Sequence, residues 1–271
     1  MISIEVHILY DIVRLEEKLL INELSKRGLS AKPIRAEFIN INGGSINAVG
    51  LIRVAGRSKV LPLSFTYQEL GLGSINPFNS LYITHDKFLT LVKLIKAGIP
   101  TPKSTLLLDH GEEALSALGS PLIIKPTDGS WGRLVALVNT IREANLVMRS
   151  YDDGVLLGQE YVKKPKRDIR VTVVGERAVA AIYRYSDDWR TNTARGGSAA
   201  PVKIDPELED ISVKASVATG SVYSGVDIVE SERGYLVLEV NGVPEFKNVQ
   251  RVTGVNVAGE IAEEVARLII S

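Results

Sequence analysis

The chain has 271 residues, enough for a substantial core and for two or three domains. Its 32 basic and 32 acidic residues balance, which argues against a protein that binds nucleic acid through bulk charge. The sequence contains no cysteine, and this excludes disulfides, zinc–thiolate sites and cysteine nucleophiles.

Neither a histidine metal site nor a membrane segment is predicted. The three histidines, His7, His85 and His110, are scattered without metal-ligand spacing. The first residues open directly into a strand pattern, and no apolar run reaches the roughly 18 residues of a membrane span. We therefore expect a cytoplasmic protein with no nucleic-acid or membrane partner.

The N-terminal third alternates strand-like and helical patterns. We predict a strand over 2–10, a helix over 11–27 that ends at Gly28, and strands over 32–39 and 50–54. This order is typical of a small open α/β domain. A turn-rich stretch follows over 71–79.

The rest of the chain adds further strands and helices. A helix begins at Asp86 and ends at Gly98. The later predicted strands cover 122–125, 134–138, 169–174 and 178–185, and the later predicted helices cover 141–149, 206–220 and 259–270.

Two apolar runs flank Glu232-Arg-Gly234 and predict a hairpin. A three-residue loop with left-handed Gly234 pairs Ser231 with Tyr235, which places Asp227 opposite Glu239. Asn241 then lies on the same face. Two opposed carboxylates repel unless a cation lies between them, and all-oxygen ligands suit Mg²⁺ or Mn²⁺. The alternative is an exposed polar hairpin face.

Small residues between two apolar strands, Gly129-Ser-Trp-Gly-Arg133, predict a loop that closes over a polyphosphate. An ordinary hairpin turn is the alternative. Lys125 ends the preceding strand and Lys87 begins a helix; each alone is more typical of a solvated lysine.

Two arginines lie on otherwise apolar strands. Arg170 and Arg184 need oxygen partners there, and phosphates or carboxylates match the fork of a guanidinium. Structural salt bridges with Glu160 or Asp168 are the alternative. The stretch Asn192 to Gly197 offers an amide, backbone N–H groups and a further arginine for an anion.

In this order these residues resemble an ATP-grasp ligase. The sequence motifs are most similar to those of the LysX/ArgX group of amino-group carrier protein ligases, which are relatives of the ribosomal-protein glutamate ligase. The resemblance rests on Gly129 to Arg133, Lys166 to Arg170, Asn192 to Gly197 and Glu239 to Asn248. It implies an α/β (α+β) ATP-grasp fold with an N-terminal open α/β domain. We expect an N-terminal domain over 1–80, a linker helix and lid subdomain over 81–165, and a C-terminal subdomain with the Mg²⁺ site over 166–271.

The resemblance also implies roles for residues, and we state them as expectations. Arg170 and Arg184 would neutralise negative charge during catalysis. Asp227, Glu239 and Asn241 would bind Mg²⁺ or Mn²⁺. The ATP contacts would be Lys87, Lys125, Gly129, Ser130, Trp131, Gly132, Arg133, Gln159, Glu160, Tyr161, Val162, Arg184 and Asn192. The amino-acid contacts would be Thr193, Ala194, Glu245, Phe246, Lys247, Asn248 and Val249.

The implied reaction is ATP-dependent amide formation in lysine biosynthesis. ATP would activate the γ-carboxylate of a C-terminal glutamate on a small acidic carrier protein, and the amino group of an amino acid would then attack. In this family, Asn followed by a small residue goes with α-aminoadipate and Gly-Phe goes with glutamate, so Asn248-Val249 favours α-aminoadipate. Val249 is not the expected small hydroxyl residue, which leaves glutamate or dual specificity open.

Other functions remain as alternatives. These are a ribosomal-protein glutamate ligase, a dipeptide ligase and a non-enzymatic ATP-binding module. We also expect a homo-oligomer.

Overall fold

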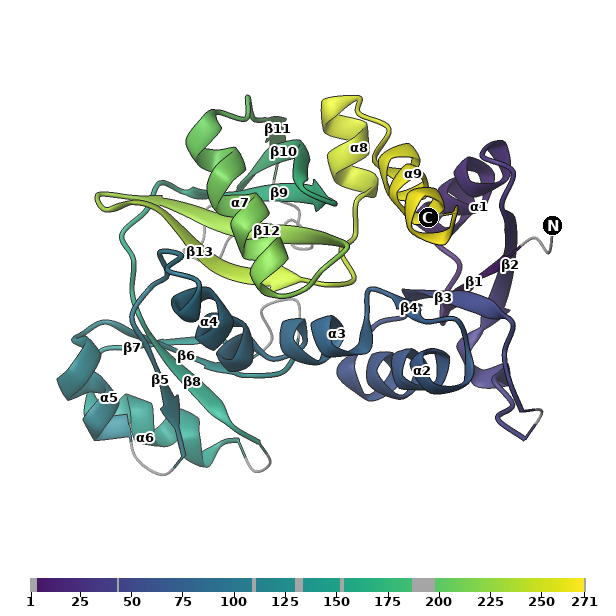
Figure 1. Ribbon diagram of the computed structural model, residues 1–271. Helices are drawn as coiled ribbons and strands as arrows, with labels where there is room; N and C mark the ends of the chain where they lie inside the picture. Colours follow the sequence, from purple (N-terminus) through teal and green to yellow (C-terminus); the bar gives the residue numbers. More distant parts are fainter. Residues whose placement is uncertain are drawn as a thin grey trace.

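The computed structural model describes residues 4–42, 44–108, 111–129, 134–151, 154–186 and 198–270. Within these ranges the chain forms three sheets, each accompanied by helices (Figure 1). In the same ranges, no helix combines the length and the apolar character needed to cross a membrane.

The first sheet is parallel, with the strand order β2-β1-β3-β4. Its strands are β1 (Glu5–Tyr10), β2 (Ser30–Arg35), β3 (Ala48–Arg53) and β4 (Ser74–Ile75), accompanied by α1 (Leu15–Lys26), the 3-10 turn η1 (Ala36–Phe38) and α2 (Arg57–Leu70). Ile8 packs in a cluster with α1, whereas Leu9 packs in a cluster with α2. Successive strand residues point to opposite faces, so helices cover both sides of this sheet.

The second sheet is antiparallel, with the order β5-β8-β6-β7. Its strands are β5 (Ser104–Leu107), β6 (Leu122–Pro126), β7 (Ala136–Val138) and β8 (Leu156–Glu160), and its helices are α5 (Gly111–Leu118) and α6 (Ile141–Arg149). Leu122 and Ile124 pack with Ala114 of α5 and Ala144 of α6. Both helices therefore cover the same face, and Leu157 on the other face packs in a cluster with Leu94 of α4.

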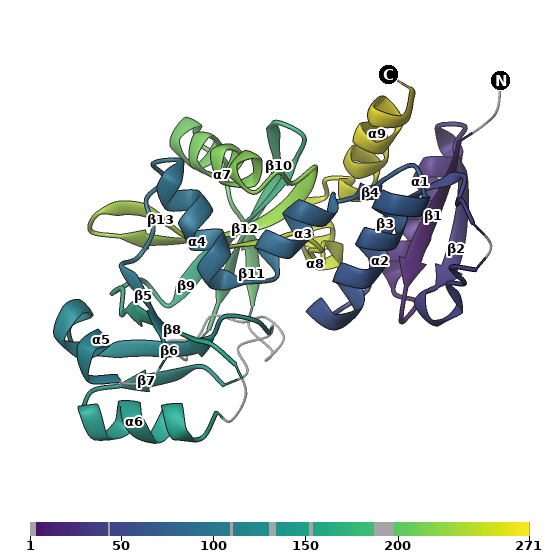
Figure 2. The ribbon, with the colours of Figure 1, turned by 60° about the horizontal axis from the view of Figure 1, so that its bottom comes forward.

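The third sheet is antiparallel, with the order β11-β10-β9-β12-β13. Its strands are β9 (Arg167–Val174), β10 (Arg177–Tyr185), β11 (Ala199–Pro201), β12 (Tyr223–Ser231) and β13 (Gly234–Asn241). Nearby helices are α3 (Phe78–Thr84), α4 (Lys87–Lys96) and α7 (Pro206–Ala218). Leu94 of α4 shares a core cluster with Ile211 of α7, Val171 of β9 and Leu157 of the second sheet. Figure 2 shows the second sheet below the third, with α4 beside both.

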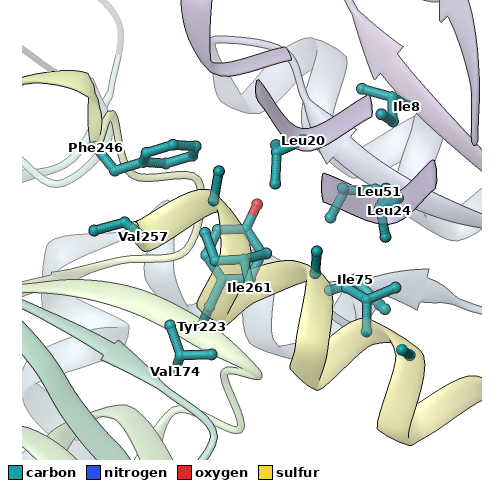
Figure 3. Packing of buried hydrophobic residues seen from close by; sticks show 14 of the residues in the cluster. Ile8, Leu20, Leu24, Leu51, Ile75, Val174, Tyr223, Phe246, Val257 and Ile261 are labelled. Atoms are coloured by element: carbon teal, nitrogen blue, oxygen red, sulfur yellow. The ribbon is translucent and has the colours of Figure 1, made fainter. Parts of the chain in front are cut away.

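The C-terminal helices connect the third sheet to the first. They are α8 (Lys247–Thr253) and α9 (Val257–Ile270). Ile261 of α9 lies between Leu20 of α1 and Tyr223 of β12 (Figure 3). Arg27 Nε, just after α1, donates to Glu263 Oε2 over 2.7 Å. The last helix is thus part of the core of the N-terminal sheet.

Most predicted elements are present, and their ends differ. The helix over 141–149 is α6, whose Thr140 and Glu143 form a capping box. The helix after Asp86 is α4, capped by the Asp86 carboxylate. The strand predicted over 32–39 was misplaced, because β2 ends at Arg35 and η1 follows. Helices α2, α3, α5 and α8 were not predicted.

The hairpin prediction combines a correct pairing with a wrong loop. Asp227 does pair with Glu239, but Ser231 pairs with Gly234, so the loop has two residues rather than three. A register shift at Asp227/Ile228 leaves Leu238 as an extra residue, because Ile228 pairs with Val237. The bulge offsets the shorter loop and restores the predicted register.

The three sheets span residues 5–75, 104–160 and 167–241. The division into parts over 1–80, 81–165 and 166–271 stays a prediction. Seven predicted site residues, Ser130, Trp131, Gly132, Arg133, Asn192, Thr193 and Ala194, lie outside the described residues.

Candidate functional site

A network of arginines and carboxylates crosses three strands of the third sheet. Arg170 on β9 lies opposite Asp227 on β12, donates from Nη2 to Oδ2 over 2.8 Å and donates from Nε to Oδ1. Arg184 on β10 lies opposite Asp168 on β9 and binds it through two hydrogen bonds of 2.7 and 2.8 Å. Arg184 Nη2 also lies 3.1 Å from Asp227 Oδ1. Arg184 thus makes the salt bridge with Asp168 that the sequence analysis gave as the structural alternative, whereas Arg170 pairs with Asp227.

The buried groups of this network stay charged. Burial alone would raise the pKa of Asp227, but Arg170 and Arg184 outweigh it and lower that pKa to about 2. Burial would likewise lower the pKa of Arg184, but Asp227 and Asp168 raise it above its usual value. Fixed positive charge beside ionised carboxylates is suited to a site where a phosphoryl group accumulates negative charge.

Of the three predicted metal ligands, Asp227 is buried within the network, and Glu239 and Asn241 are half-buried beside it. Glu239 pairs with Asp227 across the hairpin, and Asn241 Nδ2 donates to Glu239 Oε1 over 3.3 Å. Carboxylate and amide oxygens fit Mg²⁺, which usually takes its remaining ligands from phosphates and water. No cluster of three His, Cys, Asp or Glu residues in the described part of the chain would hold a metal alone. These residues would therefore hold Mg²⁺ together with a phosphate, and their role stays a prediction.

Two predicted ATP-binding lysines lie near each other, Lys125 on β6 of the second sheet and Lys87 at the start of α4. Lys125 Nζ donates to Gln159 Oε1 over 2.9 Å, and Gln159 Nε2 donates to Ser104 Oγ over 2.9 Å. Burial and Lys87 lower the pKa of Lys125 to about 8, against the opposing effect of Glu239 and Asp227. Lys125 therefore lies within electrostatic reach of the hairpin carboxylates, and Lys87 lies within electrostatic reach of Lys125.

Lys87 is tied to the start of the predicted phosphate loop. Its Nζ donates to the Gly129 carbonyl over 2.7 Å, and its backbone N–H donates to the Thr127 carbonyl over 2.7 Å. Gly129 has a φ of +100°, a conformation that side chains other than glycine rarely adopt. The loop thus leaves the second sheet in a conformation that depends on glycine.

The predicted ATP-contacting segment from Gln159 to Val162 begins with the last two residues of β8. Glu160 Oε1 accepts a hydrogen bond from the Lys103 backbone N–H over 2.8 Å. It also forms an ion pair with Arg233 in the hairpin turn. Glu160 therefore does not pair with Arg170 or Arg184. Tyr161 and Val162 come next and are half-buried. A nucleotide contact by these residues stays a prediction.

The predicted amino-acid contacts after β13 divide into two sets. Glu245 and Lys247 are exposed, and Asn248 accepts a hydrogen bond of 2.7 Å from Arg251. Phe246 and Val249 are buried in the core cluster beneath α9. These two side chains serve the core in the described structure, and a direct contact with substrate stays a prediction.

The sequence analysis missed two buried residues that hold the end of the hairpin. Asn76 Nδ2 donates to the carbonyls of Tyr223 and Gly242 over 2.7 and 2.6 Å. Arg53 Nη1 donates to the Pro244 carbonyl over 2.9 Å. An arginine at the end of an apolar strand was the available signal for Arg53, and it is the signal that identified Arg170. No local pattern indicates Asn76.

A family model described as the RimK-like ATP-grasp domain matches residues 84–265, which contain every described residue of this network. The chain belongs to the RimK-like ATP-grasp family. Two relatives align with nearly the whole of this chain. The α-aminoadipate–LysW ligase LysX of Sulfurisphaera tokodaii is 38% identical over 95% of this chain and 96% of its own. The glutamate–LysW ligase ArgX of Sulfolobus acidocaldarius is 33% identical over 96% of this chain and 97% of its own.

Solved structures confirm the ATP-grasp fold. A RimK domain ATP-grasp protein from Sphaerobacter thermophilus superposes with a TM-score of 0.79 at 24% identity, covering 96% of this chain and 98% of its own. A D-alanine–D-alanine ligase from Bacillus anthracis gives a TM-score of 0.75 at 19% identity, covering 98% of each chain. The predicted ATP-grasp fold is therefore correct for this RimK-like protein.

Proposed function

We propose that this protein is an ATP-dependent carboxylate–amine ligase. It joins the α-amino group of α-aminoadipate to the γ-carboxylate of the C-terminal glutamate of a small LysW-type carrier protein, a step of lysine biosynthesis. The observation that carries the ligase function is the placement of Lys125 within electrostatic reach of Asp227 in the Arg170–Asp227–Arg184 network. The LysX and ArgX relatives support the carrier protein as the partner.

The chain's own groups suit the activation of a carboxylate. A carboxylate oxygen of the carrier attacks the γ-phosphorus of ATP, ADP leaves, and an acyl phosphate forms. Lys87 and Lys125 hold the polyphosphate, and Arg170 and Arg184 offset the charge on the transferring group. Mg²⁺, held by Asp227, Glu239 and Asn241, would supply further charge neutralisation at the phosphate oxygens.

The second step forms the amide. The amino group of α-aminoadipate attacks the acyl carbonyl carbon, phosphate leaves, and the nitrogen loses a proton. Positioning of the two reactants accounts for much of the rate in such a step.

Glutamate is a second candidate for the amino acid. It is one methylene shorter than α-aminoadipate, and the ArgX relative is named for glutamate. One methylene changes transition-state binding by only about 1–3 kcal/mol, so one site is able to use both amino acids.

We further propose that the enzyme works in the cytoplasm as a homo-oligomer and accepts Mn²⁺ in place of Mg²⁺. Oxygen ligands suit both metals. Light scattering of the purified protein tests the oligomer, and ADP release with each metal tests the exchange.

The decisive experiment measures ADP release with the carrier protein and each amino acid. We expect turnover only when ATP, the carrier and an amino acid are all present, with the higher kcat/KM for α-aminoadipate. A carrier that lacks its C-terminal glutamate is the control and should give no turnover. Equal turnover with that truncated carrier, or turnover only with a ribosomal-protein tail, contradicts the proposal.

A further inference from the structure

The loop between β13 and α8 is held by side chains from the N-terminal part of the chain. Asn76 binds the Gly242 carbonyl over 2.6 Å, Arg53 binds the Pro244 carbonyl over 2.9 Å, and Glu16 Oε1 accepts from the Lys247 backbone N–H over 3.3 Å. This segment, 242–247, leads directly into the predicted amino-acid contacts. Its backbone position therefore depends on distant residues.

Arg53 is the most tightly held of these anchors. It is 1% exposed at the end of β3, and its Nε lies 3.3 Å from Glu17 Oε1. Its guanidinium carbon lies 5.4 Å from the centroid of the Phe246 ring. The other oxygen of Glu17 accepts from the Arg14 backbone N–H over 2.6 Å, so Glu17 is itself fixed at the start of α1. Arg53 thus has a single geometry available to it.

Buried charge around Arg53 is not explained by stability alone. Glu16 and Glu17 are both buried, and Glu16 Oε2 has no hydrogen-bond partner in the described part of the chain. Burial would lower the pKa of Arg53, but Tyr223, Glu17 and Glu16 raise it, so the guanidinium stays charged. A buried ion pair is often no more stable than an apolar pair of similar size. This arrangement therefore calls for a role beyond packing.

Pro244 connects this anchor to the reaction site. A Cβ placed on Gly225 would lie 3.1 Å from Pro244 Cβ and 2.9 Å from Arg170 Nη1. Pro244 and Arg170 therefore both flank Gly225 on β12, and Arg170 holds Asp227, two residues further along that strand. The Pro244 carbonyl that Arg53 binds thus belongs to a residue that lies beside the predicted metal-binding strand.

We propose that Arg53 is a positioning residue for the amino-acid substrate, acting through the Pro244 carbonyl on segment 242–247. This inference rests on the proposed ligase function. Arg53 touches neither the lysines nor Gly129, so it should affect amino-acid use more than ATP use.

The test compares the variant pair Glu17→Gln/Arg53→Met with the conservative variant Arg53→Lys. The double variant removes both charges of the ion pair, which limits the loss of stability. We expect the double variant to raise the KM for the amino acid at least tenfold while the KM for ATP stays within twofold. Arg53→Lys keeps the charge but lacks the fork that binds two partners, so we expect a smaller rise.

A matched control and a binding readout complete the test. Arg27→Met/Glu263→Gln breaks another bridge between the N-terminal and C-terminal parts, remote from Pro244, and should leave both KM values unchanged. In the double variant, the thermal shift with Mg-ADP should persist and the shift with the amino acid should shrink. An unchanged amino-acid KM, or equal rises of both KM values, overturns the inference. If the double variant does not fold, Arg53→Lys decides. A rise in its amino-acid KM alone supports the inference, whereas an unchanged amino-acid KM or equal rises of both KM values overturn it.

Failure of the proposed function gives a different result. In that case wild type releases no ADP with the carrier and either amino acid. Arg53 is then judged by the thermal shifts alone, and a full amino-acid shift in the double variant overturns its role.

Discussion

Arg170 and Asp227 face each other on neighbouring antiparallel strands, with Arg170 Nη2 2.8 Å from Asp227 Oδ2. From the sequence, Asp227 and Glu239 repel each other unless a metal lies between them. In the structure a guanidinium already neutralises Asp227, so the two carboxylates differ in their surroundings. Asp227 is buried between two arginines, whereas Glu239 is half-buried and accepts from Asn241.

Removal of Asp227 should therefore destabilise the protein more than removal of Glu239. Asp227→Ala leaves Arg170 without its carboxylate, and breaking a buried pair costs about 3–5 kcal/mol. Glu239→Ala should cost less than about 1 kcal/mol. Both should abolish ADP release through loss of a predicted metal ligand. Thermal denaturation without Mg²⁺ and an ADP assay measure the two effects.

Glu230→Ala is the matched control for these variants, because it breaks the half-exposed Arg167–Glu230 pair on the same strand as Asp227. It should retain activity. Equal stability losses for Asp227→Ala and Glu239→Ala would contradict the stabilising role of the Arg170–Asp227 ion pair. Full activity in either variant would contradict the predicted metal site.

Nucleotide affinity should fall as the pH rises through about 8. Burial lowers the pKa of Lys125 from 10.5 to about 8, so its charge is lost above that pH. Binding of an ATP analogue should weaken by up to about tenfold over the next pH unit. Calorimetric titration across this range measures the change. The variant Lys125→Met should bind more weakly and lack this pH dependence.

The same group affects stability in the opposite direction. Between pH values of about 8 and 10.5 the unfolded chain holds a proton on Lys125 that the folded chain has lost. Lys125 therefore makes the free energy of unfolding rise with pH in that window. Denaturant titrations should show a smaller rise in Lys125→Met than in wild type; identical slopes would contradict the lowered pKa.

Substitution of Gly129 should impair ATP use. Its φ of +100° strains any residue with a Cβ, although nothing lies within 4 Å of that position. We expect Gly129→Ala to cost about 1–2 kcal/mol in backbone energy and to raise the KM for ATP by roughly tenfold. Gly98→Ala is the control, because Gly98 also has a positive φ with open space around it but follows α4. A similar KM change in both variants would show that strain alone is responsible.

Replacing Asn248-Val249 by Gly-Phe, the pair that goes with glutamate in this family, should affect folding at one position and substrate preference at the other. Val249 is 2% exposed, so Val249→Phe overpacks the core at a cost of about 1–3 kcal/mol. Asn248 is partly exposed and bonds Arg251, so Asn248→Gly should fold normally. We expect Asn248→Gly to shift the kcat/KM ratio toward glutamate. An unchanged ratio, with Arg251→Ala as the control for the lost hydrogen bond, would contradict this specificity role.

Local signals in the sequence determined several elements of this protein. Thr140 and Glu143 cap α6 through contacts within one turn, and Asp86 caps α4 in the same way. The hairpin pairing of Asp227 with Glu239 was also predictable, because strands joined by a short loop must lie side by side. In each case the interacting residues are close in the chain.

Only the tertiary structure decided how the distant parts meet. The sequence showed that Arg184 needs an oxygen partner, but packing of β10 against β9 decided that Asp168 supplies it. Val249 is buried in a core cluster that includes Leu20 of α1, and Arg53 of β3 reaches Pro244, so both contacts join residues that are far apart in the chain. Such contacts depend on which surfaces exclude water together, and local residue preferences carry little information about that choice.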